Sequence, residues 1–488
     1  EALANLKIDA DMSSGMADNF TISGTSTGKL NITGINILAD GDAQKITVFN
    51  NGISPELTVI NSYTNAMKYV FEADSENAGV LQISSTVAGD FDGFTAALAD
   101  TGKRSFSATG DVVIKENLVQ MQGTKLTIFG NKHAFDGGGF TGLSTADGQN
   151  LEISEAGAFT LTESADGSIL RWSSSGEAVY YNLTVDNAGL HNFSGEALHN
   201  AGTASIEKSV ISNTITNTGT LSASNVLFSD AVTNTGTMSS ANSIVQKTLN
   251  NSGTLNLYST SFNGQDSSLE NTSKAEISGS IFNKNATSVT NSGELDIKAS
   301  LFNENTLAVE SSANAQISDS TFLKNASGVK ISAGAEVEIS NSGFGSNTEA
   351  AIEVEDGKAI ISDGEFSQNA TAIKVSSGAT AEITNGEFNN NTTAITSSGS
   401  VVINASENSK LSFDANTNGA IKSTGTLTIN GAKNSTISFS NNTGSSAIDA
   451  AGLNIAAEKL IFTNNASGAI KNSGTGTISA SELTFTSS

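Results

Sequence analysis

Three short stretches place aspartate beside glycine, and in two of them a pair of carboxylates lies two positions apart, a pattern that loops use to bind Ca²⁺. They contain Asp40 and Asp42 in ADGDA, Asp90 and Asp92 in GDFDG, and Asp136 before the triple glycine of HAFDGGGF. Calcium takes roughly six to eight oxygen ligands, so each stretch supplies only part of a site. Aspartate beside glycine also forms Asx turns, in which the carboxylate bonds its own backbone. We interpret these residues as turn residues and expect no cofactor, with Ca²⁺ as the open alternative.

Other residue types that serve catalysis are scarce. The chain has no cysteine, which excludes disulfides, thiolate metal sites and cysteine nucleophiles together. Its only arginines, Arg104 and Arg171, are too few for a lyase that pairs a basic residue with Ca²⁺-binding carboxylates. The three histidines, His133, His191 and His199, show no metal-ligand spacing. We predict no enzymatic activity, although a carboxylate pair for glycan hydrolysis stays open among 49 acidic residues.

The charge balance disfavours two classes of partner. Lys and Arg number 24 against 49 Asp and Glu, a net charge of −25. A surface of that sign repels nucleic-acid phosphates and anionic lipid headgroups. No stretch approaches the roughly 18 apolar residues of a membrane-spanning helix. The sequence starts at Glu1 without a charged and then apolar leader, so we expect any signal peptide to lie outside it.

Phenylalanine recurs through the C-terminal half at intervals of 20 to 26 residues, with partners at fixed offsets. The series is Phe262, Phe282, Phe302, Phe322, Phe344, Phe366, Phe388, Phe413, Phe439, Phe462 and Phe485. Asparagine follows three positions later at Asn285, Asn305, Asn325, Asn347, Asn369, Asn391, Asn416, Asn442 and Asn465. Isoleucine lies five positions earlier at Ile277, Ile297, Ile317, Ile339, Ile361 and Ile383. Upstream, NTGT or NSGT begins at Asn217, Asn234 and Asn251, a period of 17.

This period predicts an all-β, right-handed parallel β-helix of about 20 coils, forming an elongated rod. The apolar positions are Ile, Val and Phe in short alternating runs, which favour strands over the leucine-rich horseshoe that is the other solution at this period. Phe lies five positions after Ile, an odd offset that would place the two side chains on opposite faces of a flat strand. A corner between them returns both side chains to the interior.

We predict that one phenylalanine and one asparagine per coil stack into structural ladders. An Asn ladder passes amide hydrogen bonds from coil to coil, and Asn tolerates the left-handed backbone that corners need. The proposed ladder residues are Phe282, Phe302, Phe322, Phe344, Phe366, Phe388, Asn285, Asn305, Asn325, Asn347, Asn369 and Asn391. A role for these asparagines in binding carbohydrate or metal is the alternative.

The pattern divides the chain into two parts. Residues 201–488 form regular coils of 17 to 26 residues. Residues 1–200 are less regular, and we expect the same architecture there with excursions and an N-terminal cap that protects the sheet edge. The stretch FTAALAD at residues 94–100 predicts one short helix.

The repeated phrases resemble the passenger repeats of bacterial autotransporters, in particular those of polymorphic outer-membrane proteins, which pair F-x-x-N with G-G-A-[ILV]. The first half is matched across residues 282–465. The second half is degraded to NGAI at 418–421, SGAI at 467–470 and SSAI at 445–448. The resemblance implies a non-enzymatic passenger that an outer-membrane β-barrel carries to the extracellular surface of a bacterium, where it acts as an adhesin or surface structure.

Three classes of function therefore stand as hypotheses. The favoured one is an elongated surface protein that displays loops to an unidentified surface receptor or glycan. The alternative is a secreted β-helix that processes or binds polysaccharide, because this scaffold also serves such enzymes. The third is a filament subunit that stacks end to end.

Overall fold

The computed structural model is almost entirely β, with 62% strand and 2% helix, which confirms the all-β prediction. It forms a parallel β-solenoid of about 17 turns, slightly fewer than expected. The structure describes residues 4–21, 30–39, 41, 43–50, 60–63, 67–89, 91–99, 101, 103–116, 118–119, 121–131, 133, 135–136, 150–154, 159–160, 170–172, 177–181, 184–185, 198–200, 203–211 and 214–486.

The chain divides into two compact units. The first is Glu1–Ile215 with Gly219–Leu221, and the second is Thr216–Thr218 with Ser222–Ser488. The division passes through two short strands, β22 (Ile215–Asn217) and β23 (Thr220–Ser224).

The first unit opens with short and long strands around an apolar cluster that includes Ile8, Phe49, Tyr69 and Phe71. The elements are β1 (Ala4–Asp11), β2 (Met16–Ala17), β3 (Phe20–Thr21), β4 (Leu30–Ala39), β5 (Lys45–Thr47), β6 (Phe49–Asn50), β7 (Ile60–Tyr63), β8 (Met67–Ala73) and β9 (Val80–Gly89). Strand β1 pairs with β4 in parallel, whereas β7, β8 and β9 pair antiparallel. Hairpin strands advance no coil, which is one reason why about 20 coils overstates the count.

The helix predicted at residues 94–100 is confirmed as α1 (Phe91–Ala99), which begins three residues earlier. It buries Phe91, Phe94 and Leu98. Parallel strands follow it in the first unit, with β10, β12, β14, β17 and β20 pairing in succession. The remaining elements are β10 (Lys103–Ala108), β11 (Val112–Val113), β12 (Lys125–Phe129), β13 (Phe135–Asp136), β14 (Asn150–Ser154), β15 (Phe159–Thr160), β16 (Leu170–Trp172), β17 (Glu177–Tyr181), β18 (Thr184–Val185), β19 (Leu198–Asn200), β20 (Thr203–Glu207) and β21 (Val210–Ile211).

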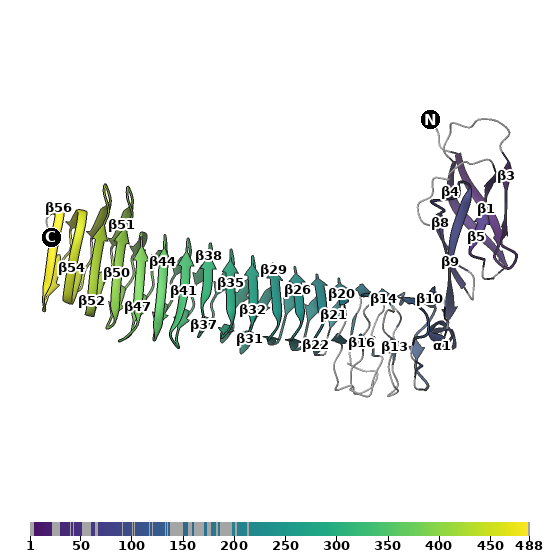
Figure 1. Ribbon diagram of the computed structural model, residues 1–488, viewed down its shortest axis with the longest axis horizontal. Helices are drawn as coiled ribbons and strands as arrows, with labels where there is room; N and C mark the ends of the chain where they lie inside the picture. Colours follow the sequence, from purple (N-terminus) through teal and green to yellow (C-terminus); the bar gives the residue numbers. More distant parts are fainter. Residues whose placement is uncertain are drawn as a thin grey trace. The chain divides into compact units, whose positions relative to one another are not determined.

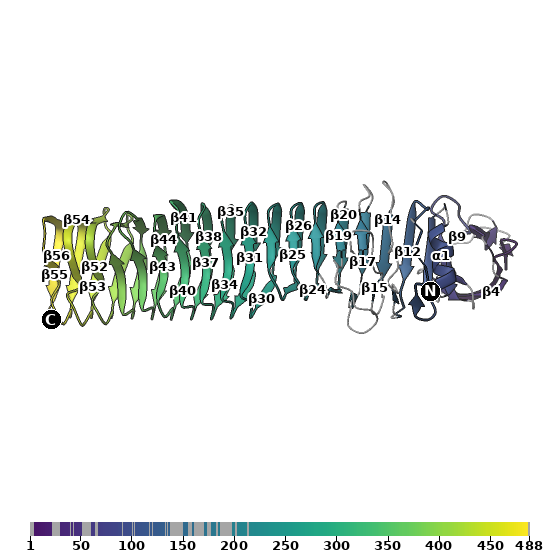
Figure 2. The ribbon, with the colours of Figure 1, turned by 90° about the horizontal axis from the view of Figure 1, so that it is seen from below.

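The second unit is a solenoid whose coils follow one another along one axis (Figures 1 and 2). Its strands build three parallel sheets, which we call the Ile, Phe and third sheets. The Ile sheet holds β26 (Thr237–Ala241), β29 (Thr254–Tyr258), β32 (Lys274–Ser278), β35 (Glu294–Lys298), β38 (Ala315–Ser318), β41 (Ala335–Ser340), β44 (Gly357–Ser362), β47 (Thr380–Thr384) and β50 (Ser400–Ala405).

The other two sheets follow the same succession. The Phe sheet holds β24 (Leu227–Phe228), β27 (Ile244–Val245), β30 (Ser261–Asn263), β33 (Ile281–Asn283), β36 (Leu301–Asn303), β39 (Thr321–Leu323), β42 (Gly343–Gly345), β45 (Glu365–Ser367), β48 (Gly386–Asn389), β51 (Lys410–Asp414) and β53 (Thr436–Ser440). The third sheet holds β25 (Val232–Asn234), β28 (Leu249–Asn251), β31 (Ser267–Asn271), β34 (Thr287–Asn291), β37 (Leu307–Ser311), β40 (Ser327–Ile331), β43 (Ala350–Val354), β46 (Thr371–Val375), β49 (Thr393–Ser397) and β55 (Ile470–Asn472). Three long strands bend through more than one sheet: β52 (Ile421–Gly431), β54 (Ile448–Thr463) and β56 (Gly476–Thr486).

A backbone corner explains how Ile and Phe both face inward. Ile317 and Phe322 are both buried, and Asp319 between them has φ 51°, in the left-handed region. The same corner recurs in neighbouring coils at Gly279, Ala299, Asn341, Asp363 and Asn385. The bend predicted from the odd Ile-to-Phe spacing is confirmed.

Candidate binding surface

The predicted ladder phenylalanines lie in the interior and stack ring on ring. From Phe262 to Phe462, centroids of successive rings are 4.7 to 5.1 Å apart and the ring planes differ by at most 11°. Isolated aromatic pairs prefer offset or edge-to-face geometry. Here the spacing equals the distance of about 4.8 Å between neighbouring strands, so the coil rise sets the stacking. Phe282, Phe302, Phe322, Phe344, Phe366 and Phe388 all belong to this stack.

The predicted ladder asparagines are buried and bonded to one another. Asn305, for example, donates from its backbone N–H to Asn325 Oδ1 at 2.9 Å and from its Nδ2 to the same oxygen at 2.9 Å. Its Nδ2 also donates to the carbonyl of Phe282 in the preceding coil at 3.0 Å. The pattern continues through Asn285, Asn305, Asn325, Asn347, Asn369, Asn391, Asn416, Asn442 and Asn465. These amides are occupied within the scaffold and do not reach an external ligand.

The left-handed backbone lies one residue before the ladder asparagine. Lys324 has φ 53° and Glu304 has φ 56°, and each precedes a ladder position. The expectation that the ladder asparagine itself adopts this conformation was therefore wrong. The asparagine instead turns its amide inward, where it bonds three groups, and its neighbour makes the corner.

Two further polar ladders escaped the sequence analysis. Buried serines at Ile+3 form the first, in which the N–H of Ser300 donates to Ser320 Oγ at 3.1 Å. Asparagines form the second: Asn234 Nδ2 donates to Asn251 Oδ1 at 2.7 Å, and Asn251 Nδ2 to Asn271 Oδ1 at 2.7 Å. The signal was present, because NTGT and NSGT begin with ladder residues and serine recurs two positions before Phe.

Of the carboxylates considered for Ca²⁺, the structure describes only the side chain of Asp92. Asp40, Asp42 and Asp90 lie outside the described residues, as does the side chain of Asp136. Asp92 lies in the first turn of α1, where a negative charge favours the helix dipole. Across the described residues, no group of three or more His, Asp or Glu side chains is placed to hold a metal ion.

Among the histidines and arginines, the structure describes only the side chain of His133. His133 Nδ1 lies 3.6 Å from Asp111 Oδ1, and both side chains are open to solvent. His191 and the side chains of His199, Arg104 and Arg171 fall outside the described residues.

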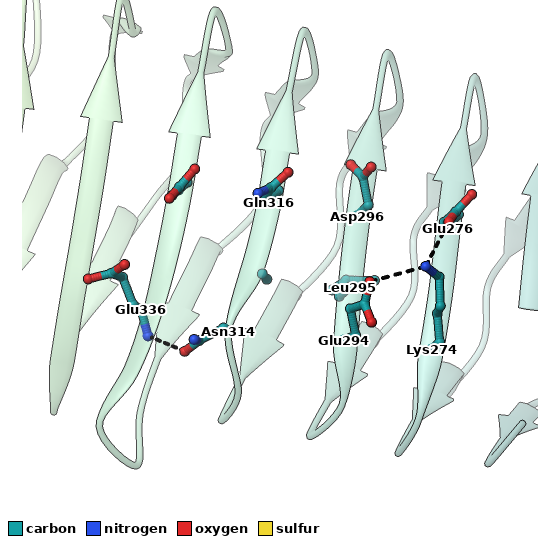
Figure 3. Close-up of a pocket in the computed structure, with 10 residues that line it drawn as sticks. Lys274, Glu276, Glu294, Leu295, Asp296, Asn314, Gln316 and Glu336 are labelled. Carbon is teal, nitrogen blue, oxygen red and sulfur yellow. Dashed lines mark hydrogen bonds and ion pairs between the residues drawn. The ribbon is translucent and has the colours of Figure 1, made fainter. Parts of the chain in front are cut away.

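The outer face of the Ile sheet carries a shallow polar groove of about 400 Å³ (Figure 3). It lies over β32, β35, β38 and β41, whose outward positions alternate with the buried Ile positions. Register aligns one row along the groove, from Glu276 through Asp296 and Gln316 to Glu338. A second row includes Lys274 beside Glu294.

Lys274 is the one cation lining this groove. Its Nζ lies 3.2 Å from a carboxylate oxygen of Glu276 and 3.2 Å from one of Glu294. The hydrogen bond to Glu294, followed by that to Glu276, raises the pKa of Lys274 above its usual value. The two carboxylates remain 53% and 71% exposed, so water screens these ion pairs and they contribute little to stability.

The groove continues toward an exposed aromatic ring. An adjoining hollow of about 310 Å³ is lined by Asn256, Tyr258, Asp296 and Lys298 among others. Tyr258 is 59% exposed although it is a large aromatic residue. An exposed tyrosine beside carboxylate and amide groups offers one flat apolar surface and several hydrogen-bond acceptors, a combination that suits polyhydroxylated ligands.

The comparisons with known proteins give no relative. No family model, no curated protein and no solved structure matches this chain. Among the described residues, no helix combines the length and apolar character needed to cross a membrane.

Proposed function

We propose that the protein is a non-enzymatic bacterial surface protein, an adhesin or structural passenger whose solenoid displays its outer faces to an extracellular receptor or glycan. The observation that carries the proposal is that the inward and outward side chains of each strand differ in what they contact. Inward positions are filled by ladders that hold coil to coil, as in Asn325 and Phe322. Most outward positions are polar and vary from coil to coil, as in the row from Glu276 through Asp296 to Gln316.

The resemblance to autotransporter passengers supports the same proposal. It supplies the route, in which an outer-membrane β-barrel carries the chain to the cell surface. The absence of cysteine suits passage through an oxidising compartment, where free thiols would cross-link. The net charge of −25 suits a partner that is neither nucleic acid nor an anionic membrane.

A secreted β-helix that processes or binds polysaccharide is the second candidate, and the groove of Lys274 is the observation that bears on it. A glycosidase acid needs a raised pKa, which an apolar, water-poor site provides. Glu276 and Glu294 instead project from an open groove, where both contact a lysine and remain largely exposed to water. The groove therefore supports glycan binding better than glycan cleavage.

A surface-accessibility experiment tests the proposal. Intact cells of the source bacterium are treated with an added protease, and the chain is followed with an antibody against the second unit. We expect cleavage on intact cells while a cytoplasmic marker stays whole. Protection of the chain until the cells are lysed would contradict surface display, and release of reducing sugar from a uronate polymer by the purified protein would contradict a non-enzymatic role.

A further inference from the structure

A second groove, of about 430 Å³, runs across five successive coils on the third sheet. It lies over β46, β49, β52, β54 and β55. Four small buried residues, Val375, Ser397, Ser423 and Ala450, are each at most 4% exposed and form its floor. With a rise of about 4.8 Å per coil, four steps give a channel of about 19 Å along the solenoid axis.

One wall is a row in which cations outnumber anions. Register aligns Lys374, Thr396, Lys422 and Asp449 in successive coils. Lys374 Nζ contacts Glu353 at 2.6 Å, and Asp449 contacts Lys471 Nζ at 3.0 Å. Within residues 214–486, which the structure describes without a gap, Lys422 has no ion-pair partner. Lys422, a half-buried lysine without an ion pair, therefore lies at the middle of the groove, with Asp449 next to it in the row.

The opposite wall is a row of hydroxyl groups. Ser398, Thr424 and Ser473 each donate from the side chain to a backbone carbonyl of the preceding coil, at 3.4 Å. A hydroxyl group has one donor and two acceptor lone pairs. Because the hydroxyl hydrogens of these residues already bond backbone carbonyls, their oxygens face the groove as acceptors. Such acceptors match the hydroxyl donors of a sugar.

The backbone of the groove has no free hydrogen-bonding groups for a peptide that would add as an extra strand. Strands β46, β49 and β52 pair with one another and with β54 along the coils. A peptide that adds as an extra strand needs unpaired backbone groups at a sheet edge. This groove has no free sheet edge, so a ligand would contact its side chains.

We propose that this groove, centred on Lys422, binds a linear anionic glycan, whose acidic groups contact Lys422 and Lys374 and whose hydroxyl groups bond the Ser and Thr wall. The class of ligand is inferred from the residues of the groove. The inference rests on the proposed function only for the expectation that the protein meets this ligand outside the cell. The acidic group is a carboxylate or a sulfate, since both are anionic acceptors for an ammonium group.

The test measures binding of fluorescently labelled probes to the purified full-length chain. The probes are oligogalacturonate, dextran sulfate, neutral dextran and poly-glutamate. We expect at least one of the two anionic glycans to bind about tenfold or more tightly than both dextran and poly-glutamate, and added salt to weaken that binding. The comparison of oligogalacturonate with dextran sulfate identifies the acidic group. Equal binding of poly-glutamate, equal binding of dextran or no binding of either anionic glycan overturns the inference.

Three variants locate the site. Lys422→Glu should weaken binding about tenfold or more, as expected for the loss of a charge-assisted hydrogen bond. Ala451→Phe fills the groove without changing the charge and should weaken binding as well. Lys410→Glu makes the same charge change on an exposed lysine outside the groove and should change binding less than about twofold. Equal effects of Lys422→Glu and Lys410→Glu, or no effect of Ala451→Phe in a folded variant, overturn the assignment.

The outcome is separable from that of the proposed function. If the purified protein fails to bind the glycan, the protease-accessibility result on intact cells is unaffected. A chain that proves to be intracellular still binds or fails to bind the glycan as a purified protein.

Discussion

The side-chain oxygen of Asn347 accepts two hydrogen bonds from Asn325, one from its backbone N–H at 3.0 Å and one from its Nδ2 at 3.2 Å. The two residues are 22 positions apart in the sequence and lie in successive coils. Asn347 Nδ2 in turn donates to the carbonyl of Phe322 at 3.2 Å. One side chain thereby satisfies three buried polar groups of another coil, each of which would otherwise cost free energy.

Replacement of this asparagine should therefore destabilise the solenoid. We expect Asn347→Ala to reduce the free energy of unfolding by about 2–3 kcal/mol, because it leaves the buried N–H of Asn325 and the carbonyl of Phe322 without these partners. The Nδ2 of Asn325 keeps its bond to the carbonyl of Phe302 at 3.1 Å. Urea unfolding followed by circular dichroism measures the change. Asn263→Ala is the control, since Asn263 accepts a bond from Asn283 Nδ2 at 2.8 Å in solvent. Its loss should cost less than about 0.5 kcal/mol, and an equal cost would contradict the ladder account.

Truncation of a ladder phenylalanine should be costly inside the stack and mild at its end. Phe322 is fully buried between Phe302 and Phe344, so Phe322→Ala should lower the free energy of unfolding by about 3–5 kcal/mol. Phe485 stacks only on Phe462 and is 60% exposed. Phe485→Ala should therefore cost less than half as much in the same urea experiment. A similar loss of stability at both positions would show that the cost of truncation does not depend on whether the ring lies inside the stack or at its end.

Glycine should stabilise the corner that precedes the ladder asparagine. Lys324 has φ 53°, a conformation that costs a residue with a Cβ about 1 kcal/mol. We expect Lys324→Gly to raise the free energy of unfolding, by up to about 1 kcal/mol after the entropy of the unfolded chain is counted. Lys298→Gly in β35 is the control and should lower it by about 0.5–1 kcal/mol. The same sign for both variants would argue against the left-handed corner.

The first unit should lose stability in acid through Asp74. Its buried carboxylate accepts a bond from Lys45 Nζ at 2.9 Å and bonds from the N–H groups of Glu76 and Asn77. The bond to Lys45, followed by that to the backbone of Glu76, holds the pKa of Asp74 far below its usual range. Because the folded pKa lies below the unfolded value of about 3.9, this stability is present above that value and is lost as the pH falls below it.

The Asp74→Asn variant tests this assignment. Thermal melting between about pH 7 and pH 3 should show a smaller acid-induced decrease in Tm for Asp74→Asn than for the unsubstituted chain. Asp296→Asn, which changes an exposed carboxylate of the groove, should leave the pH profile unchanged. An unaltered profile for Asp74→Asn would rule out Asp74 as a source of the acid sensitivity.

Much of the second unit follows from the sequence, because a solenoid repeats its inward positions. The period, the burial of Ile317 and Phe322 and the corner between them could all be read from spacing. The Ser320 ladder could not be distinguished from ordinary turn chemistry, since Ser is abundant throughout the chain. Outward residues carry no periodic signal, so the grooves around Lys274 and Lys422 depend on the register between coils.

The first unit was harder to predict for a different reason. Alternating apolar residues, as in β8 and β9, are compatible with either parallel or antiparallel pairing. The turn residues that would indicate a tight hairpin, such as an Asn-Gly or Asp-Gly pair, do not follow β7 or β8 in the sequence. Direction of pairing therefore emerges only from contacts between residues such as Tyr69 and Ser85, which are distant in sequence and paired in the sheet.

A double-mutant cycle on Phe322 and Phe344 tests most directly whether equivalent residues lie on one another in successive coils. Their ring centroids are 4.7 Å apart, and stacked aromatic pairs couple by about 0.5–1.5 kcal/mol. We predict a coupling in that range from the unfolding free energies of the two single Ala variants and the double variant, whereas Phe322 and Phe439, several coils apart, should be additive. Additivity of Phe322 and Phe344 within about 0.3 kcal/mol would contradict the stacked coil on which the account depends.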